Sequence, residues 1–179
     1  MARSAGLLIT LSVVVLLFVA LPREAATSLK PPRVEQNTHT EPLAIIVNRS
    51  NPVNRLTMVE LRKIFLGERG HWSDGRRVTL VIREPGEPEY KTILRDVCQM
   101  DETALRNHIL GRLFTGEMLV SPKTLDTPVG VRKFIFNVPG AIGYLRLSDV
   151  DGTVKIVTID ELLPVDSDYK LRVEVAHAN

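Results

Sequence analysis

The sequence has little of the chemistry that most readily reveals a function. Its one cysteine, Cys98, excludes a disulfide within the chain. Aromatic residues make up 5% of the chain and cations are scattered among acids, with a net charge of +2, so no nucleic-acid-binding surface is indicated. No P-loop, dinucleotide-binding or nucleophile-elbow motif occurs, and no histidine has metal-ligand spacing (His39, His71, His108 and His177). We therefore expect a protein that is not an enzyme and that needs no cofactor or metal.

One long apolar run is present, and it lies at the N-terminus. Arg3 precedes about 15 mostly apolar residues, 7–21, which is short of the roughly 20 that span a bilayer. This pattern predicts a signal peptide over residues 1–26 and export to the periplasm. Because Arg23 and Glu24 interrupt the small-residue cleavage pattern, an uncleaved membrane anchor stays open as an alternative. Residues 27–42 are polar and contain three prolines, which predicts a flexible linker.

The remaining residues, 43–175, predict one domain in which strands alternate with helices. Continuous apolar runs indicate buried strands, whereas capping residues and an apolar stripe of helical spacing indicate helices. Thr127-Pro128, for example, has the form of an N-cap followed by a first-turn proline. We expect an α/β fold with a mostly parallel sheet flanked by helices. The predicted strands are 43–47, 78–82, 141–147 and 154–159; helices begin near 57, 88, 101 and 127, and 121–126 is a loop.

The stretch from Arg83 to Glu89 is the strongest candidate for a binding site. A strand that ends in a glycine-containing loop and leads into a helix presents backbone N–H groups to an anion, and Arg83 adds a guanidinium. Gly86 lies in this loop. Three glutamates occupy the same seven residues (Glu84, Glu87 and Glu89) and oppose a negative ligand. The sequence therefore predicts an anion site whose affinity depends on where these carboxylates point.

Three further residues are candidates for the same site. Ser50 and Asn51 follow a predicted strand, where ligand sites of α/β proteins usually lie, although turn formation before Pro52 explains them equally well. Thr127 is the predicted N-cap of a helix whose N-terminus faces the same cleft, and capping alone also accounts for it. The candidate ligand-binding set is thus Arg83, Gly86, Ser50, Asn51 and Thr127.

Three linked motifs carry a resemblance to a known family. They are Leu56-Thr57-x-x-Glu60-Leu61-x-x-Ile64-Phe65-Leu66-Gly67, Trp72-x-Asp74-Gly75 and Pro139-Gly140-Ala141-Ile142-Gly143-Tyr144. In this order they resemble the phosphate-type periplasmic substrate-binding proteins of ABC transporters. The match covers about residues 43–157 and is similar to one lobe of those two-lobed receptors, and more closely to small single-lobe exported relatives. It implies a periplasmic-binding-protein-like fold.

The resemblance also implies a function and its partners. It implies an exported module that binds phosphate or another small anion and delivers it to an ABC permease, with the second lobe supplied by a homodimer or another protein. In the family, a Ser-Gly-Thr sequence after the arginine grips the phosphate, whereas here Glu87, Pro88 and Glu89 occupy those positions. This departure keeps a second interpretation open: an accessory or sensor module that binds a protein partner and has lost phosphate binding.

Overall fold

The structure, a computed structural model, describes residues 38–176, so the predicted signal peptide and most of the predicted linker lie outside the described residues. Within this range the elements are β1 (Thr38–Asn48), β2 (Arg55–Leu56), α1 (Met58–Phe65), β3 (Thr79–Arg83), α2 (Pro88–Thr92), the π-helix η1 (Ile93–Cys98), α3 (Glu102–Phe114), β4 (Lys123–Leu125), α4 (Pro128–Asn137), β5 (Ala141–Arg146), the 3₁₀ turn η2 (Leu147–Asp149), β6 (Val154–Ile159) and β7 (Arg172–Ala176). The predicted α/β class with helices around a central sheet is confirmed.

The described strands form one seven-stranded sheet in the order β2-β6-β1-β5-β3-β4, with β7 beside β1. β3 runs parallel to β4 and β5, and β2 runs parallel to β6. β1 is antiparallel to β5, β6 and β7, so the sheet is mixed and the expectation of mostly parallel strands needs correction. A continuous apolar run records that a strand is buried on both faces but carries no information about its direction.

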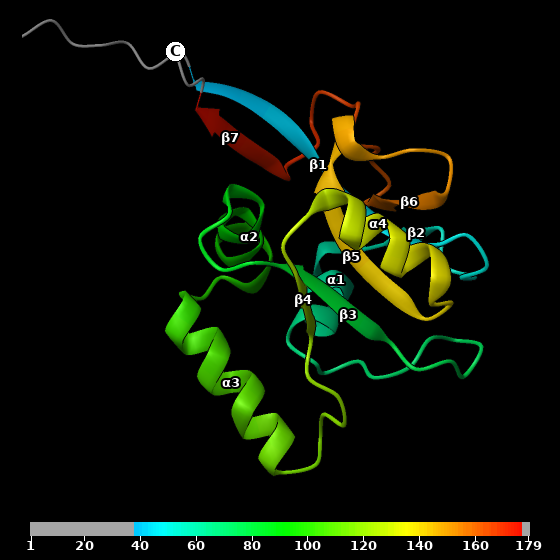
Figure 1. The fold of residues 1–179 in the computed structure, drawn as a ribbon, viewed down its shortest axis with the longest axis vertical. Helices are drawn as coiled ribbons and strands as arrows, with labels where there is room; N and C mark the ends of the chain where they lie inside the picture. Colours follow the sequence, from blue (N-terminus) through cyan, green and yellow to red (C-terminus); the bar gives the residue numbers. More distant parts are fainter. Residues whose placement is uncertain (1–37, 177–179) are drawn as a thin grey trace, which may run out of the picture. The chain divides into compact units, whose positions relative to one another are not determined.

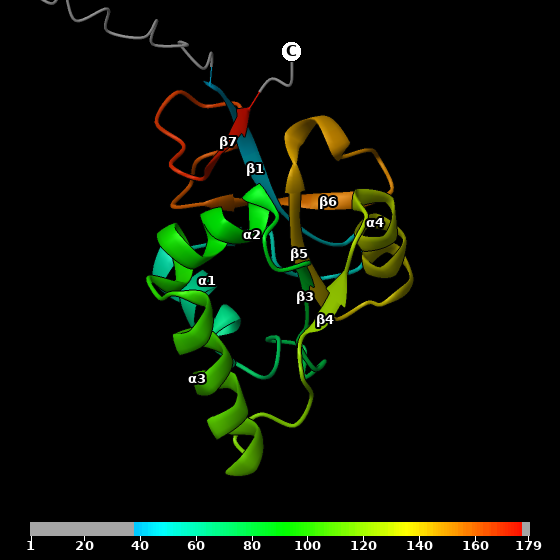
Figure 2. The same ribbon diagram turned by 60° about the vertical axis from the view of Figure 1, so that its left-hand side comes forward.

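Helices cover both faces of the sheet. Figure 2 shows α4 on one side of β3 and β5, and α1, α2 and α3 on the other. The larger core cluster joins alternate strand residues such as Leu80 and Tyr144 to Phe65 of α1. The smaller cluster joins residues of the opposite face, including Val81, to Ile135 of α4. The period-two alternation of strand side chains thus assigns each residue of β3 to one helix layer.

Local capping explains where the helices begin. Thr57 and Glu60 form a reciprocal capping box at α1, and its hydrogen bonds to Thr57 lower the pKa of Glu60. The Asp101 carboxylate accepts a hydrogen bond from the Ala104 N–H at 2.7 Å at the start of α3. Thr127 caps α4, and Pro128 occupies its first turn. These three starts agree with the sequence prediction, because capping is a local interaction.

Other predicted boundaries were wrong or incomplete. β1 begins at Thr38, so residues 38–42 belong to a strand that pairs with β7 rather than to a linker. The predicted loop 121–126 contains the short edge strand β4. The second predicted helix changes to a π-helix at Ile93 and ends at Gln99, which has a left-handed conformation (φ 54°). β2 and β7 had no predicted counterpart.

Candidate functional site: a buried arginine at the end of β3

Arg83 is the last residue of β3 and is only 5% exposed. Its backbone N–H donates a hydrogen bond to the hydroxyl of Tyr144 at 2.9 Å, and burial raises the pKa of that hydroxyl. The guanidinium Nη2 lies 3.4 Å from Oε2 of Glu87. Its Nε and Nη1 are buried without a hydrogen-bond partner. A buried cation with two unsatisfied donors is costly, so the geometry indicates a position for an external acceptor.

The side chain of Arg83 lies on the α4 face of the sheet. Val81 packs against Val131 and Ile135 of α4, and strand alternation gives Arg83 the same orientation. Arg83 is paired in register with Leu125 of β4, so the chain leaves both strands at the same end of the sheet, toward α2 from β3 and toward α4 from β4 (Figure 1). The N-terminus of α4 therefore begins beside Arg83.

Thr127 lies two residues beyond β4 and supports this end of α4. Its Oγ1 accepts a hydrogen bond from the N–H of Gly130 at 3.1 Å. The first turn of the ten-residue helix has no acidic residue, so the partial positive charge of the helix dipole is not neutralised within that turn. The structure thus brings Arg83 and Thr127 to one end of the sheet, as predicted, with Thr127 engaged in capping.

Gly86 shapes the loop that follows Arg83. The N–H of Glu87 donates to the carbonyl of Glu84 at 3.3 Å, and Gly86 has a φ of 95°. Proline at the second position and a left-handed glycine at the third are typical of a type II turn. A Cβ at Gly86 meets no atom within 4 Å, so backbone conformation rather than space requires glycine here. The turn returns Glu87 to the guanidinium of Arg83.

The three glutamates of this loop have different orientations. Glu87 faces Arg83. Glu89 is 3% exposed and forms an ion pair with Arg146 of β5. Tyr144, two residues before Arg146, packs in the cluster on the opposite face from α4, so alternation directs Glu89 away from Arg83. Glu84 is exposed. One carboxylate therefore lies at the guanidinium, and the sequence alone did not distinguish Glu87 from Glu89.

Ser50 and Asn51 lie at the opposite end of the sheet from Arg83. Because β1 is antiparallel to β5, and β5 is parallel to β3, the end of β1 lies beside the start of β3. The turn after β1 lies on the right in Figure 1, whereas α2 lies on the left. The five predicted residues thus do not form one site, and the error follows from the direction assumed for β1.

The Ser50–Asn51 turn has a structural explanation. The Oγ of Ser50 donates to Oδ1 of Asn48 at 2.8 Å, and the Nδ2 of Asn48 donates to the carbonyl of Ile135 at 2.9 Å. Arg76 donates to the Oγ and to the carbonyl of Ser50, both at 3.0 Å. Asn51 is buried, and its Oδ1 accepts the N–H of Val53 at 3.0 Å. These bonds join the end of β1 to the C-terminus of α4.

Sequence reasoning missed two residues that support the site. Tyr144 holds the backbone of Arg83, and Arg146 holds Glu89 away from it. Both lie on β5 with one residue between them, so their alternation was visible in the sequence, but the strand pairing that brings them to β3 was not. Cys98 is buried, and burial raises the pKa of its thiol to about 12. Within residues 38–176 no cluster of three potential metal ligands occurs.

Comparison with solved structures places this geometry in a known fold. A protein from Clostridium perfringens described as a phosphate ABC transporter substrate-binding protein, with bound phosphate, is 22% identical with a TM-score of 0.62; the match covers 75% of this chain and 54% of that one. An ABC-type phosphate transport receptor from Vibrio cholerae is 20% identical with a TM-score of 0.58, over 76% and 57%. PstS from Borrelia burgdorferi is 14% identical with a TM-score of 0.61, over 76% and 56%. No protein-family model matches the sequence.

The fold of the described chain is therefore that of phosphate-type substrate-binding proteins, and the resemblance predicted from three sequence motifs is confirmed at this level. The chain spans little more than half the length of these proteins. The first is described as a substrate-binding protein and the second as a transport receptor, descriptions consistent with the expectation of a non-enzyme. Within residues 38–176, none of the helices has both the length and the apolar character needed to cross a bilayer.

Proposed function

We propose that the protein is an exported anion-binding module of the phosphate-receptor type. The observation that carries the proposal is the buried guanidinium of Arg83, whose Nε and Nη1 have no partner, beside the N-terminus of α4. A phosphate oxygen accepts hydrogen bonds from such donors in a fork geometry, and a helix N-terminus favours the same charge. The bound phosphate of the Clostridium perfringens protein, which shares the fold, supports phosphate as the first ligand to test.

The ligand makes its contacts with Arg83 and with the first turn of α4, and Thr127 holds that turn in place. Gly86 sets the turn that positions Glu87. The proposal does not use Ser50 and Asn51 as ligands, since they lie at the other end of the sheet. We propose that a second lobe closes over the anion, for which a second copy of the chain or another protein is a candidate, and that a permease in the membrane receives the ligand.

Calorimetric titration of the purified protein with phosphate at neutral pH and low salt tests the proposal. Saturable heat is expected for the wild type, and loss of binding is expected for Arg83→Met, which keeps an unbranched apolar stem in the buried position. Circular dichroism and urea unfolding of this variant verify that it is folded. Unchanged phosphate affinity in folded Arg83→Met would exclude Arg83 as the ligand.

Glu87 provides a second test and supports the alternative function. Its carboxylate lies 3.4 Å from the guanidinium, at i+4, where it competes with an anion for Arg83. In Glu87→Gln this competing charge is absent, and we expect phosphate affinity to rise by about 1 kcal/mol, or roughly fivefold, because a partly exposed ion pair is worth about that much. If neither the wild type nor Glu87→Gln binds phosphate, the Arg83–Glu87 pair is a closed structural ion pair. The protein is then an accessory or sensor module that has lost the anion.

Export is tested separately from binding. The proposal predicts that the mature protein is periplasmic and begins near residue 27, whereas an uncleaved N-terminus leaves an anchored form of the same domain. Cell fractionation combined with the intact mass of the recovered protein distinguishes the two forms. Recovery of the full-length protein in the soluble cytosolic fraction would refute export in either form.

A further inference from the structure

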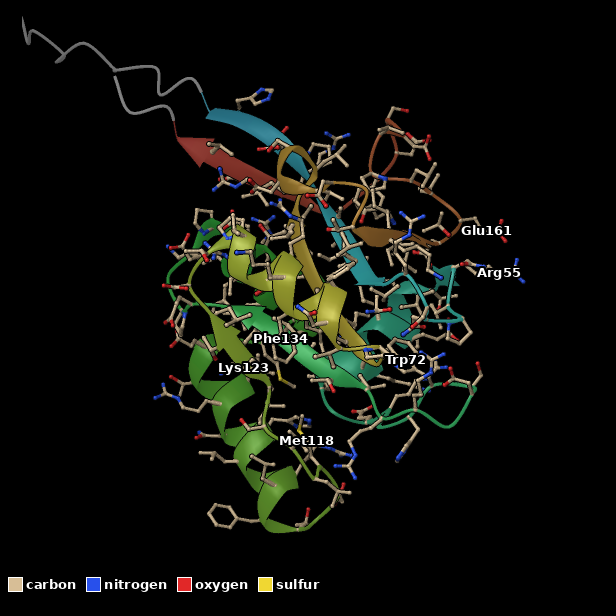
Figure 3. All side chains as sticks on the ribbon, turned by 45° about the vertical axis from the view of Figure 1, so that its right-hand side comes forward. Arg55, Trp72, Met118, Lys123, Phe134 and Glu161 are labelled. Carbon is tan, nitrogen blue, oxygen red and sulfur yellow. The ribbon has the colours of Figure 1, made fainter. Side chains whose placement is uncertain are left out.

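A cavity lies at the opposite end of β3 from Arg83. Its walls come from the loop after α1 (67–71), the start of β3 and the segment that joins α3 to β4 (117–121), and its volume is about 190 Å³. Met118 lies on that segment, and Trp72 lies next to the loop after α1 (Figure 3). Since Arg83 is at the end of β3 and this cavity surrounds the strand's first residues, the two sites are separate.

The inner wall of the cavity is apolar. Ile64 of α1 and Leu80 of β3 line it, and both side chains belong to the main core cluster. Met118 packs directly over Gly67, since a Cβ at that glycine would lie 2.8 Å from the Met118 sulfur. A small organic group enclosed here loses contact with water and gains contact with these side chains.

The outer lining is cationic. The exposed side chain of Arg77 has no ion pair or side-chain hydrogen bond within the described chain. Arg69 lies over the Trp72 ring at 5.7 Å, and its Nη1 is 3.6 Å from Glu60, too long for a hydrogen bond. Glu117 also lines the cavity, but its carboxylate is 2.8 Å from the guanidinium of Arg112. Arg77 and Arg69 both line the cavity and keep guanidinium donors that are not engaged: within residues 38–176 only the Nε of Arg69 forms a hydrogen bond, to the His71 carbonyl at 3.4 Å.

We propose that this cavity binds a small monocarboxylate with an apolar body, of about the size of benzoate. Arg77 and Arg69 hold the carboxylate, for which the guanidinium fork is matched, and the apolar body lies against Ile64, Leu80 and Met118. A cavity of about 150 Å³ is sufficient for a benzene ring, so the size is adequate. An inorganic oxyanion leaves the apolar wall unfilled and gains less from binding here.

Gly70 offers a way to block the cavity without altering the fold. It lines the cavity, a Cβ built on it meets no atom within 4 Å, and its φ is not positive. The Cβ of Gly70→Leu is therefore accommodated without a clash, and the larger side chain is expected to occupy space in the cavity. Gly152 has the same open surroundings and is not part of this cavity, so Gly152→Leu is the matched control. Arg77→Gln removes the charge of an exposed side chain and keeps a polar group that can form hydrogen bonds.

The experiment is a titration of the full chain with benzoate, benzamide and inorganic phosphate, followed by the fluorescence of Trp72, the one tryptophan of the chain. Saturable binding of benzoate is expected in the wild type and in Gly152→Leu. We expect benzoate affinity to fall by roughly tenfold in Arg77→Gln, which loses a charge-assisted contact, and in Gly70→Leu, which loses space in the cavity. We expect the wild type to bind benzamide roughly tenfold more weakly than benzoate, because benzamide has no carboxylate. Three outcomes would each overturn the proposal. They are a benzoate affinity in Gly70→Leu equal to that of the wild type, displacement of benzoate by equimolar phosphate, and the absence of a saturable benzoate signal in the wild type.

Discussion

Gly140→Ala is expected to be among the most destabilising single changes in the domain. A Cβ at Gly140 would lie 2.1 Å from the carbonyl oxygen of Arg77, well inside any van der Waals contact, so the backbone of one of the two segments must move. The carbonyl of Gly140 accepts hydrogen bonds from Nε1 of Trp72 at 2.9 Å and from the N–H of Thr79 at 3.0 Å. Movement large enough to relieve the clash therefore disturbs both bonds.

The magnitude follows from these contacts. Each lost hydrogen bond contributes about 1 kcal/mol, and a buried donor left without a partner, such as the indole N–H of Trp72, adds about 1–3 kcal/mol. We expect a loss of about 3–5 kcal/mol in the free energy of unfolding, a large fraction of the ~5–15 kcal/mol of a domain. Urea unfolding followed by Trp72 fluorescence and by circular dichroism measures it.

Gly152→Ala is the control, because a Cβ there meets no atom within 4 Å. It is expected to leave stability within about 0.5 kcal/mol of the wild type. A Gly140→Ala protein within about 1 kcal/mol of the wild type would refute the reasoning, since the backbone at Gly140 and Arg77 would then yield without losing these hydrogen bonds.

Three further changes test other contacts. Thr57→Ala removes the α1 capping box and is expected to lower the free energy of unfolding in urea by about 1 kcal/mol. Val59→Ala, at a position 63% exposed, is the control and is expected not to show this loss. Because burial raises the pKa of Cys98 from 9.0 to about 12, the native state retains a proton that the unfolded chain releases, so stability falls as pH rises above 9.0. At about pH 10 this loss in the free energy of unfolding is about 1.4 kcal/mol. Urea unfolding of Cys98→Ala at the same pH values should not show the loss. Asn48→Ala removes the side-chain bonds to the end of α4 and to Ser50; we expect a loss of about 2 kcal/mol with phosphate affinity unchanged, because this end of the sheet is remote from Arg83.

The parts of the fold that the sequence predicted correctly are those decided within a few residues. The helix starts at Thr57, Asp101 and Thr127 depend on side chains that bond to the backbone of their own first turn. The strand directions depend instead on partners far along the chain. Residues 43–47 give the same apolar pattern in a parallel or an antiparallel strand, and the three-residue β4 is too short to produce a pattern at all.

In the candidate site too, the local features could be predicted from the sequence and those that depend on distant strands could not. Arg83 and Gly86 belong to one local strand–turn–helix unit, and the sequence identified both as site candidates. Ser50 entered the prediction because the end of β1 was assumed to lie beside the end of β3, and the antiparallel pairing of β1 with β5 places it at the other end. The orientations of Glu87 and Glu89 were undecidable from the sequence, since they depend on Arg83 and Arg146 respectively.

Variants of the Glu89–Arg146 ion pair test whether Glu89 stabilises the fold or affects anion binding at Arg83. Glu89 is 3% exposed, its Oε1 forms the ion pair with Arg146, and its Oε2 has no hydrogen-bond partner in the described chain, so Arg146→Met leaves a buried carboxylate without its cation. We expect this variant to lose about 3 kcal/mol in urea unfolding, and the double variant Glu89→Leu/Arg146→Met to recover most of that loss, because replacing both partners of a buried pair is often nearly neutral.

A double-mutant cycle with Glu89→Leu completes the measurement. A strong coupling between positions 89 and 146, combined with unchanged phosphate affinity in the double variant, would establish that Glu89 acts within the fold. A double variant less stable than Arg146→Met would contradict the buried-charge argument. Tighter phosphate binding in the double variant would instead show that the Glu89 carboxylate opposes the anion at Arg83, so the orientation of a single buried glutamate decides how much negative charge the site must tolerate.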